Sequence, residues 1–403
     1  MRYKYIILGA GHAGLTIANY LKENNENNFI LIEKENECGG LCRSKYVDDA
    51  YIDIGGGHFL DADNDEVYKF LFKYMPEIEW SKFDRISKIE LNGEYIDHPI
   101  EANIWQLSQE LQVEYLKSIA IAGCNIKNPK PEKFVEWIYW KLGEKIASDY
   151  MIPYNQKMFG DDLNDLGTYW LEKLPSVSFD ETLLSCLNKR AYGKEPGHTR
   201  FYYPKNFGYG ELWNRMGKNI INNLALNKKV SRLNVLSKKI ETDSREKYEA
   251  EYIISTIPWI CYDEIVGVPD EIINSIKKLK FSSTIIEYIN HNIETDAHWI
   301  YYPNLDKKYH RILLRSNFLA NSKGYWTETN KNRFDYTTKN FYFENEYAYP
   351  LNTIEKPKIM NDLLNYMKKH NIYGLGRWGE HNHYNSDKVV KLAIDLGKKL
   401  LKK

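Results

Sequence analysis

Cysteine, long apolar runs and net charge are all scarce in this sequence of 403 residues. The five cysteines are odd in number and scattered, which argues against a disulfide framework. No stretch approaches the roughly 18 apolar residues of a membrane span, so we expect no integral membrane segment. The 55 basic and 55 acidic side chains cancel, and this balance favours neither nucleic acid nor an anionic membrane as a partner.

The chain also lacks internal repeats and low-complexity tracts, and its length allows two or three domains. Its first residues, Met1–Leu8, have the charge-then-apolar order of a signal peptide, but the apolar run is short and is interrupted by His12. We therefore expect a cytoplasmic protein.

A dinucleotide-binding pattern occupies the beginning of the chain. An apolar stretch at 2–8 predicts a buried strand, and Gly9-Ala-Gly-His-Ala-Gly14 follows it directly. Residues 15–21 have helical periodicity, 29–32 predict a second strand, and Glu33 ends it. This order of strand, G-x-G-x-x-G, helix, strand and acid predicts a helix N-terminus that binds a pyrophosphate and an acid that binds a ribose.

A second glycine-rich loop, 39–44, and the run Gly55-Gly-Gly-His58 follow soon after the acid. Nicotinamide dehydrogenases rarely continue in this way, whereas the loop resembles the FAD site of glutathione-reductase-like flavoproteins, so FAD is favoured over NAD. Cys38 and Cys42 lie in or beside this loop. A redox or metal pair and small residues packing near a flavin are both compatible with them, and we favour packing.

The rest of the chain predicts a discontinuous α/β protein. We expect a hairpin at 88–98 around Asn92-Gly93, helices at 104–121 and 134–147, and strands at 228–235, 253–258, 282–288 and 298–302. We interpret 321–339 as a loop or irregular cover, and we expect a final helix at 387–402. The predicted domains are a Rossmann-type FAD-binding domain (1–85, 205–260 and 350–403), an inserted helical domain (100–185), and a sheet domain for the substrate (86–99, 186–204 and 261–349).

Several short motifs together resemble one family, the flavin-dependent UDP-galactopyranose mutases, within the FAD-dependent amine-oxidase and glutathione-reductase-like superfamily. Their order and spacing carry the resemblance, which covers most of the chain: 55–58, 85–104, 131–137, 151–159, 203–210, 299–303, 309–311, 349–350 and 376–379.

The resemblance implies an isomerase that interconverts the pyranose and furanose forms of a nucleotide-diphosphate sugar without net redox change. In this family N5 of reduced FAD is the nucleophile at C1 of the sugar. It also implies a role in cell-surface polysaccharide biosynthesis, a reductant such as NAD(P)H or a cellular flavin donor, and a homodimer.

The same resemblance implies the site residues. Tyr154 and Phe159 match the aromatic pair at the nucleotide base, Arg311 and Lys173 match two arginines at the diphosphate, and Tyr349 matches a phosphate-binding tyrosine. We predict catalytic roles for His58, Arg311 and Lys173, and substrate binding by Tyr154, Phe159, Lys173, Arg311, Tyr349 and His383. The predicted cofactor-binding residues are Gly9, Gly11, His12, Ala13, Gly14, Glu33, Gly40, Leu41, His58, Val230, Arg377 and Asp387; no metal ligand is expected.

The sequence departs from the family on the sugar-nucleotide side. Lys173 replaces an arginine, His383 replaces a tyrosine, and a tyrosine expected near Leu184 is missing. A relative that acts on another nucleotide or sugar fits these changes, and the sequence names neither the sugar nor the nucleotide.

Two other functions compete with this interpretation. An FAD-dependent oxidoreductase of the amine-oxidase or protoporphyrinogen-oxidase type would share the fold, but it would not need Lys173, Arg311 and the aromatic pair for a diphosphate. A protein that has lost its flavin and binds partner proteins is disfavoured by the intact glycines at 9, 11 and 14 and by Glu33.

Overall fold

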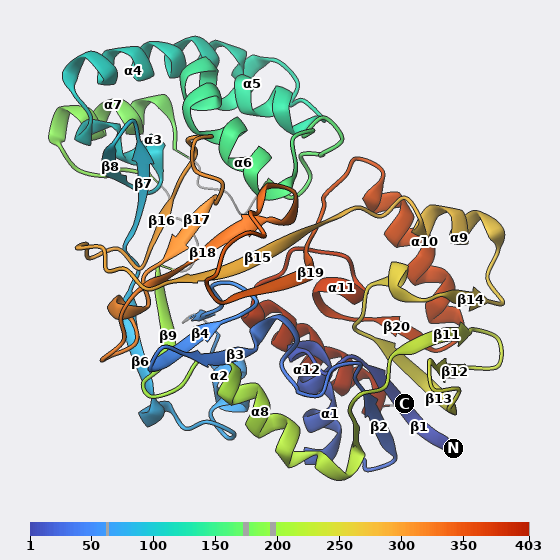
Figure 1. The fold of residues 1–403 in the computed structure, drawn as a ribbon. Helices are drawn as coiled ribbons and strands as arrows, with labels where there is room; N and C mark the ends of the chain where they lie inside the picture. Colours follow the sequence, from blue (N-terminus) through green and yellow to red (C-terminus); the bar gives the residue numbers. More distant parts are fainter. Residues whose placement is uncertain (62–63, 172–176, 194–198, 403) are drawn as a thin grey trace.

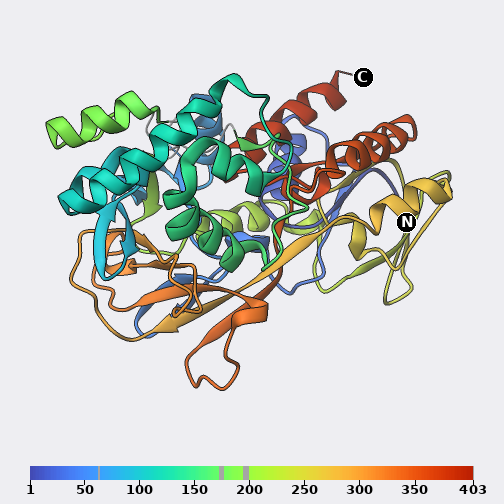
Figure 2. The same cartoon turned by 90° about the horizontal axis from the view of Figure 1, so that it is seen from above.

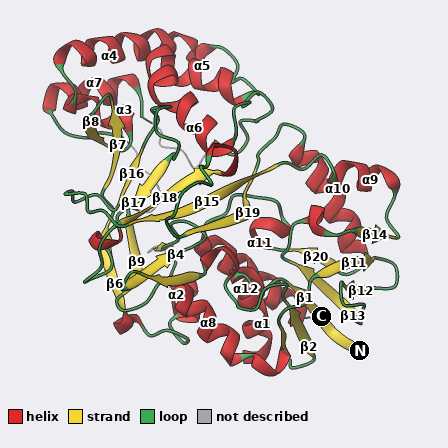
Figure 3. Cartoon of the chain, in the orientation of Figure 1, coloured by secondary structure: helices red, strands yellow, loops and turns green. Residues whose placement is uncertain are grey.

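The computed structural model describes residues 1–61, 64–171, 177–193 and 199–402. These residues form an α/β structure with two large sheets and a helical block, shown in Figure 1 and coloured by secondary structure in Figure 3. The two sheets lie side by side, and the helical block stands at the far end of the second sheet from the chain termini.

The first sheet is mostly parallel and is organised around β1, which has the predicted bounds, as does β2. Its strand order is β10-β2-β1-β13-β12-β11-β14, with β20 paired to β13. The strands are β1 (Arg2–Leu8), β2 (Phe29–Ile32), β10 (Leu224–Ala225), β11 (Val230–Asn234), β12 (Lys239–Thr242), β13 (Lys247–Ser255), β14 (Glu264–Val266) and β20 (Ile372–Gly374).

Helices cover both faces of this sheet, which explains the uninterrupted apolar sequence of β1. Tyr5 and Ile7 belong to the core with helices on one face, and Ile6 and Leu8 belong to the core with helices on the other. The first face carries α1 (His12–Glu23), α8 (Gly210–Asn219) and α12 (Ser386–Leu401); the second carries α9 (Asp270–Ile276) and α10 (Lys356–Lys369).

Gly14 lets α1 approach the turn that precedes it. A Cβ atom at this position would lie 1.9 Å from the carbonyl oxygen of Gly9. Only glycine therefore fits here without a shift of backbone, and the close packing that the G-x-G-x-x-G spacing predicts is present.

The second sheet has the order β19-β15-β18-β17-β16-β7-β8 and is antiparallel except between β16 and β7. The predicted hairpin is confirmed as β7 and β8, and Asn92 and Gly93 both have the positive φ of a tight hairpin turn. The strands are β7 (Ser87–Leu91), β8 (Glu94–Asp97), β15 (Phe281–Ile289), β16 (Trp299–Tyr301), β17 (Arg311–Leu313), β18 (Tyr325–Asn330) and β19 (Tyr342–Pro350).

The prediction of a loop over 321–339 is wrong in its central part. β18 lies inside the second sheet, between β15 and β17, and residues 326–330 are buried. Its polar sequence concealed this strand: Thr327 and Thr329 gain backbone partners, and the Glu328 carboxylate gains a charge partner, only after the neighbouring strands pair with β18. Tertiary pairing here overrides the polarity of the segment.

The helical block is inserted after β8, and the second sheet continues beyond it (Figure 2). It contains α3 (Ile100–Asn103), α4 (Gln109–Gly123), α5 (Phe134–Ile146), α6 (Ile152–Phe159) and α7 (Phe179–Asn188), with a π-helical segment, Ala147–Met151, between α5 and α6. The continuous helix expected at 104–121 is wrong at its start, because Ser108 caps α4 and ends the short turn Ile104–Gln106. The helix expected at 134–147 is present as α5, but Gly143, with φ 79°, interrupts it by a kink.

Smaller elements connect the two sheets. A hairpin is formed by β3 (Ser44–Val47) and β4 (Ala50–Asp53), and a three-stranded sheet by β5 (Leu60–Asp61), β6 (Trp80–Asp84) and β9 (Arg200–Pro204). The remaining short helices are α2 (Asp65–Leu71) and α11 (Gly376–Gly379). β14 belongs to the first sheet although it follows the boundary expected at 260/261. In the part of the chain that the structure describes, no helix is both long and apolar enough to span a membrane.

Candidate functional site

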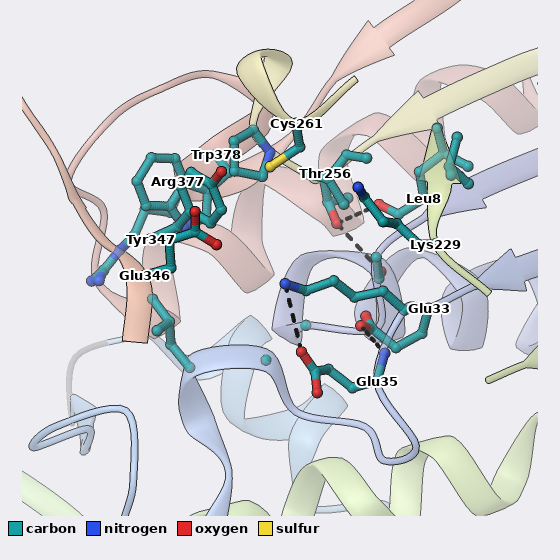
Figure 4. Close-up of a pocket in the computed structure, with 18 of the residues that line it drawn as sticks. Leu8, Glu33, Glu35, Lys229, Thr256, Cys261, Glu346, Tyr347, Arg377 and Trp378 are labelled. Atoms are coloured by element: carbon teal, nitrogen blue, oxygen red, sulfur yellow. Dashed lines mark hydrogen bonds and ion pairs between the residues drawn. The ribbon is translucent and has the colours of Figure 1, made fainter. Parts of the chain in front are cut away.

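A cavity of about 650 Å³, which we call the cofactor cavity, opens where β1, β2 and β13 end beside the first turn of α1. Figure 4 shows Glu33 and Glu35 on one side of it and Tyr347, Arg377 and Trp378 on the other. Ligands of open α/β sheets bind at this carboxyl edge of the strands. The cavity brings together nine of the predicted cofactor-binding residues: Gly9, Gly11, His12, Ala13, Glu33, Gly40, Leu41, Val230 and Arg377.

Glu33 is held at the end of β2 by two backbone bonds. Its carboxylate accepts hydrogen bonds from Ala10 N at 2.6 Å and from Glu35 N at 2.9 Å. Burial raises the pKa of this carboxyl, and the two backbone donors oppose that rise. The acid is therefore fixed in direction beside the cavity, as a ribose-binding group needs to be.

The opposite wall has an unsatisfied donor. Arg377 donates from Nη1 to Ala348 O at 3.2 Å and from Nη2 to Tyr384 O at 3.0 Å. Its Nε is buried, and no acceptor among the described residues meets it. A buried guanidinium with a spare N–H is suited to an anionic or carbonyl-bearing ligand.

The fixed carboxylate of Glu33 and the spare N–H of Arg377 fit the ribose and the pyrophosphate of FAD. α1 begins at His12 with Gly11 as its N-cap, so that the free N–H groups of its first turn adjoin the cavity. A Cβ at Gly11 would meet no protein atom within 4 Å, which shows that this space belongs to the cavity. The sequence analysis missed most of the other lining residues, among them Lys228, Lys229 and Thr256, whose separate positions gave no motif.

His12 is neutral in this setting. Burial lowers the pKa of its imidazole to about 3, and the nearby Arg377 and His58 lower it further. Cys42 Sγ lies 3.5 Å from His12 Nδ1. Cys38 instead lies against Gly217, and both cysteines are buried free thiols.

A second cavity of about 270 Å³ adjoins the first through Arg377, which lines both. We call it the central cavity. It collects five predicted residues from five separate segments: His58, Tyr154, Arg311, Tyr349 and His383. The tertiary structure therefore brings the predicted sugar and diphosphate residues to one place beside the cofactor cavity.

His58 is also a neutral imidazole. Its Nδ1 lies 3.0 Å from Gly56 O, an acceptor, so that Nδ1 carries the proton and Nε2 has a lone pair. Burial and then Arg377 lower the pKa of His58 to about 4. His58 lines the central cavity and is not among the residues of the cofactor cavity, so that it lies on the substrate side of Arg377.

Arg311, which is half-buried, forms an ion pair with a fully buried acid that the sequence did not predict. Its Nη2 lies 2.6 Å from Glu328 Oε2, and the two residues face each other across β17 and β18. Glu328 Oε1 accepts a hydrogen bond from Gly57 N at 2.9 Å, in the run that also carries His58. Burial would raise the pKa of Glu328, but Arg311 and His310 lower it well below the usual range.

The error over 321–339 explains why Glu328 was missed. A glutamate in a polar segment is ordinarily a solvated surface residue, whereas Glu328 is fully buried in β18. The alternation of Trp326 and Glu328 with threonines was the available signal for a strand.

The third cavity, about 460 Å³, lies against the helical block and has mostly aromatic walls. It shares Tyr154, Met158, Tyr301, His383 and Asn385 with the central cavity. Both residues of the predicted aromatic pair line it: the Tyr154 ring lies 5.6 Å from that of Tyr150, and the Phe159 ring lies 6.4 Å from that of Trp170. We call it the aromatic cavity.

Three predicted residues do not line these cavities. Gly14 serves helix packing, and Asp387 lies in the first turn of α12, just after the cavity-lining Asn385 and Ser386. Lys173 lies outside the described residues. Among the described residues no group of three or more His, Cys, Asp or Glu side chains is arranged to hold a metal ion.

Comparisons with known proteins agree with this arrangement. The model of the NAD(P)-binding Rossmann-like domain matches residues 7–74. The dTDP-fucopyranose mutase of Escherichia coli is 26% identical over 179 residues, 43% of this chain and 46% of that enzyme. The match therefore spans less than half the length of this curated relative.

Among solved structures, a reduced UDP-galactopyranose mutase superposes with a TM-score of 0.90 at 20% identity, covering 100% of this chain and 94% of that one. A putrescine oxidase bound to putrescine has a TM-score of 0.69 at 13% identity over 100% of both chains. A fatty acid isomerase from P. acnes has a TM-score of 0.64 at 13% identity over 98% of both chains.

At these identities the structural likenesses show a shared fold. They confirm the predicted α/β class with its Rossmann-type domain, and the fold of the UDP-galactopyranose mutase is matched more closely than the oxidase fold. Together with the curated match, they confirm the resemblance to the flavin-dependent pyranose mutases.

Proposed function

We propose that this protein interconverts the pyranose and furanose forms of a nucleotide-diphosphate sugar, with reduced FAD as its cofactor and without net redox change. One observation carries the proposal: the cofactor cavity, the central cavity with its two arginines and the aromatic cavity form a series in which each shares lining residues with the next. A sugar nucleotide has the same order of parts, with the sugar at the cofactor, the diphosphate in the middle and the base at the far end.

The cofactor cavity supplies the groups that would hold FAD. The first turn of α1 and the Arg377 Nε–H would bind the pyrophosphate, and Glu33 would accept hydrogen bonds from a ribose. When bound in its reduced form, FAD supplies the nucleophile that takes C1 of the sugar as the diphosphate leaves.

The central cavity would retain the departed diphosphate. Arg311 is held in place by Glu328 across two strands, so that its guanidinium is oriented before a ligand arrives. Tyr349 OH lies 3.5 Å from Glu328 Oε2, and its ring lies 5.0 Å from that of His383. These groups would offer donors to phosphate oxygens, with Lys173 as a further cation; His58, with its Nε2 unprotonated, would lie beside the sugar.

The ion pair would also limit the affinity of Arg311 for anionic ligands. Without a counter-ion, the half-buried guanidinium would attract every anionic ligand, including the products. Glu328 balances part of that charge, which would let the nucleotide sugar leave after ring closure. We further propose a cytoplasmic enzyme of cell-surface polysaccharide biosynthesis, reduced by NAD(P)H or a cellular flavin donor and assembled as a homodimer.

The test starts from the purified protein. Denaturation should release non-covalently bound FAD, and a colourless protein that cannot be reconstituted with FAD would end the proposal. Dithionite-reduced protein should then convert at least one member of a panel of UDP-, dTDP- and GDP-sugars to a furanose, detected by chromatography, with many turnovers per reduction. Stoichiometric consumption of NAD(P)H or oxygen would instead indicate the oxidoreductase.

A further inference from the structure

The aromatic cavity contains a carboxyl group with no partner. Glu101, on α3, lines the cavity and is 8% exposed. Among the described residues, no side chain and no neighbouring backbone group donates a hydrogen bond to its carboxylate, and the residue's own N–H is the single donor found there.

The other buried acids of the site region show how unusual this is. Asp53 accepts from Ser44, from Tyr203 OH at 3.0 Å and from Tyr209 N at 3.1 Å, and Glu328 accepts from Gly57 N and Arg311. A buried carboxylate without such donors is costly. Burial raises the pKa of Glu101 to about 7, and Lys141 lowers it only in part.

The position of Glu101 relates it to the base rather than to the sugar. The aromatic cavity has no lining residue in common with the cofactor cavity, and the central cavity lies between them. The walls around Glu101 include Trp137, Tyr150 and Tyr154, which are flat surfaces for a planar ring.

We propose that Glu101 reads the nucleotide base and that the preferred base is guanine, whose ring N1–H and amino N2–H are two adjacent donors for one carboxylate. The inference rests on the proposed function, because it assumes that a nucleotide sugar occupies the three cavities. Uracil and thymine have a single ring N–H between two carbonyl oxygens. Turned toward Glu101, they would form one hydrogen bond and bring two acceptors against a carboxylate.

The same cavity contains a complementary cation for the acceptor edge of guanine. Arg85 is the one arginine or lysine among the described residues that line it. Its guanidinium is held in place by Tyr301 OH at 3.1 Å and by the Trp299 ring at 4.8 Å. Arginine is a common partner of guanine O6 and N7, so that Arg85 would be the complementary group for the acceptor edge of this base.

The first test needs no mutation. Calorimetry with the FAD-loaded, reduced protein should show that GDP binds about tenfold or more tightly than UDP or dTDP, as expected for a charge-assisted hydrogen bond. IDP lacks only the N2 amino group and should bind about tenfold more weakly than GDP. Equal affinities for GDP and IDP would overturn the assignment of the amino group to a carboxylate.

The second test changes the carboxylate. Glu101→Gln should weaken GDP binding about tenfold or more and leave UDP binding unchanged, with the flavin spectrum and melting temperature as controls of folding. Glu110→Gln, an exposed acid in the first turn of α4, is the matched control and should change neither affinity. Unchanged GDP binding by Glu101→Gln would overturn the role of Glu101.

The outcomes separate this inference from the function on which it rests. Tighter binding of UDP or dTDP than of GDP, with furanose product from that nucleotide sugar, would overturn the guanine preference and leave the mutase intact. If none of the nucleoside diphosphates bound, both would fall.

Discussion

The cofactor side and the substrate side of this protein are constructed in different ways. On the cofactor side, β1, the glycine turn, α1, β2 and Glu33 follow one another within residues 2–33, and distant segments such as β13 and the turn at Arg377 complete the cavity around them. On the substrate side, the central cavity takes His58, Tyr154, Arg311, Tyr349 and His383 from separate segments, and it depends on the pairing of β17 with β18. A local site can be identified from a motif, whereas a site assembled at long range depends on contacts that no short motif records.

The largest expected effect is on the local side. Gly14→Ala would place a Cβ 1.9 Å from Gly9 O, a backbone atom that cannot rotate away, so that α1 and the turn must separate. We expect loss of most bound FAD and a lower melting temperature, measured by absorbance after denaturation and by thermal unfolding. Gly123→Ala is the control, because a Cβ there would meet no atom within 4 Å; a normal flavin content in Gly14→Ala would refute the argument.

The next effect tests the long-range side. Glu328→Gln leaves the guanidinium of Arg311, whose side chain is 19% exposed, without a counter-ion; breaking a fully buried pair costs about 3–5 kcal/mol, and we expect the lower end of that range here. The free energy of unfolding in urea should fall by that amount. A Glu328→Gln, Arg311→Met double mutant should recover part of the loss, and a purely additive double mutant would show that the pair is not coupled.

Arg311→Ala tests the chemistry of the same pair. It should reduce kcat/KM by more than ~2 kcal/mol of transition-state stabilisation, because a charge-assisted contact to phosphate is typically worth ~1.5–3 kcal/mol. The FAD spectrum should not change. If kcat/KM stays within a factor of about three, Arg311 does not contact the diphosphate.

The free energy of unfolding should depend on pH through the buried carboxyl of Asp53. Burial raises the pKa of Asp53 to about 7, and its donors come from β3, β9 and the start of α8. Because the folded state holds this proton more tightly than the unfolded state, its contribution to stability is complete below about pH 4 and is lost as the pH rises through 7. Urea unfolding of Asp53→Asn should depend less on pH over this range; an unchanged slope would show that Asp53 does not titrate there.

The smallest effect concerns one hydroxyl. Tyr349→Phe removes a contact of 3.5 Å to Glu328, so that stability should change by less than about 1 kcal/mol. Binding of the preferred nucleoside diphosphate should nevertheless weaken about fivefold, since a phosphate oxygen would lose a donor. Equal affinities for the wild type and the variant would remove Tyr349 from the diphosphate site.

Most of the fold was predictable from periodicity and turn chemistry. β1 and β2 have the predicted bounds, the Asn92-Gly93 hairpin is present, and the final helix begins within a residue of its expected start. Two predictions were wrong. The helix expected from residue 104 starts later because Ser108 caps α4, and the loop expected over 321–339 contains β18, a polar strand in the interior of a sheet.

The sequence by itself determined the phosphate-binding turn of the cofactor side. Such a turn requires glycines at fixed spacing between a strand and a helix, and this pattern is local in the sequence. Only the tertiary structure decided the substrate side. It paired Arg311 with Glu328, gave His58 and His383 a common cavity, and buried Glu101 where its own N–H is the single donor to its carboxylate among the described residues. The physical reason is that charge and burial are properties of neighbours in space, and for these residues the neighbours come from distant parts of the chain.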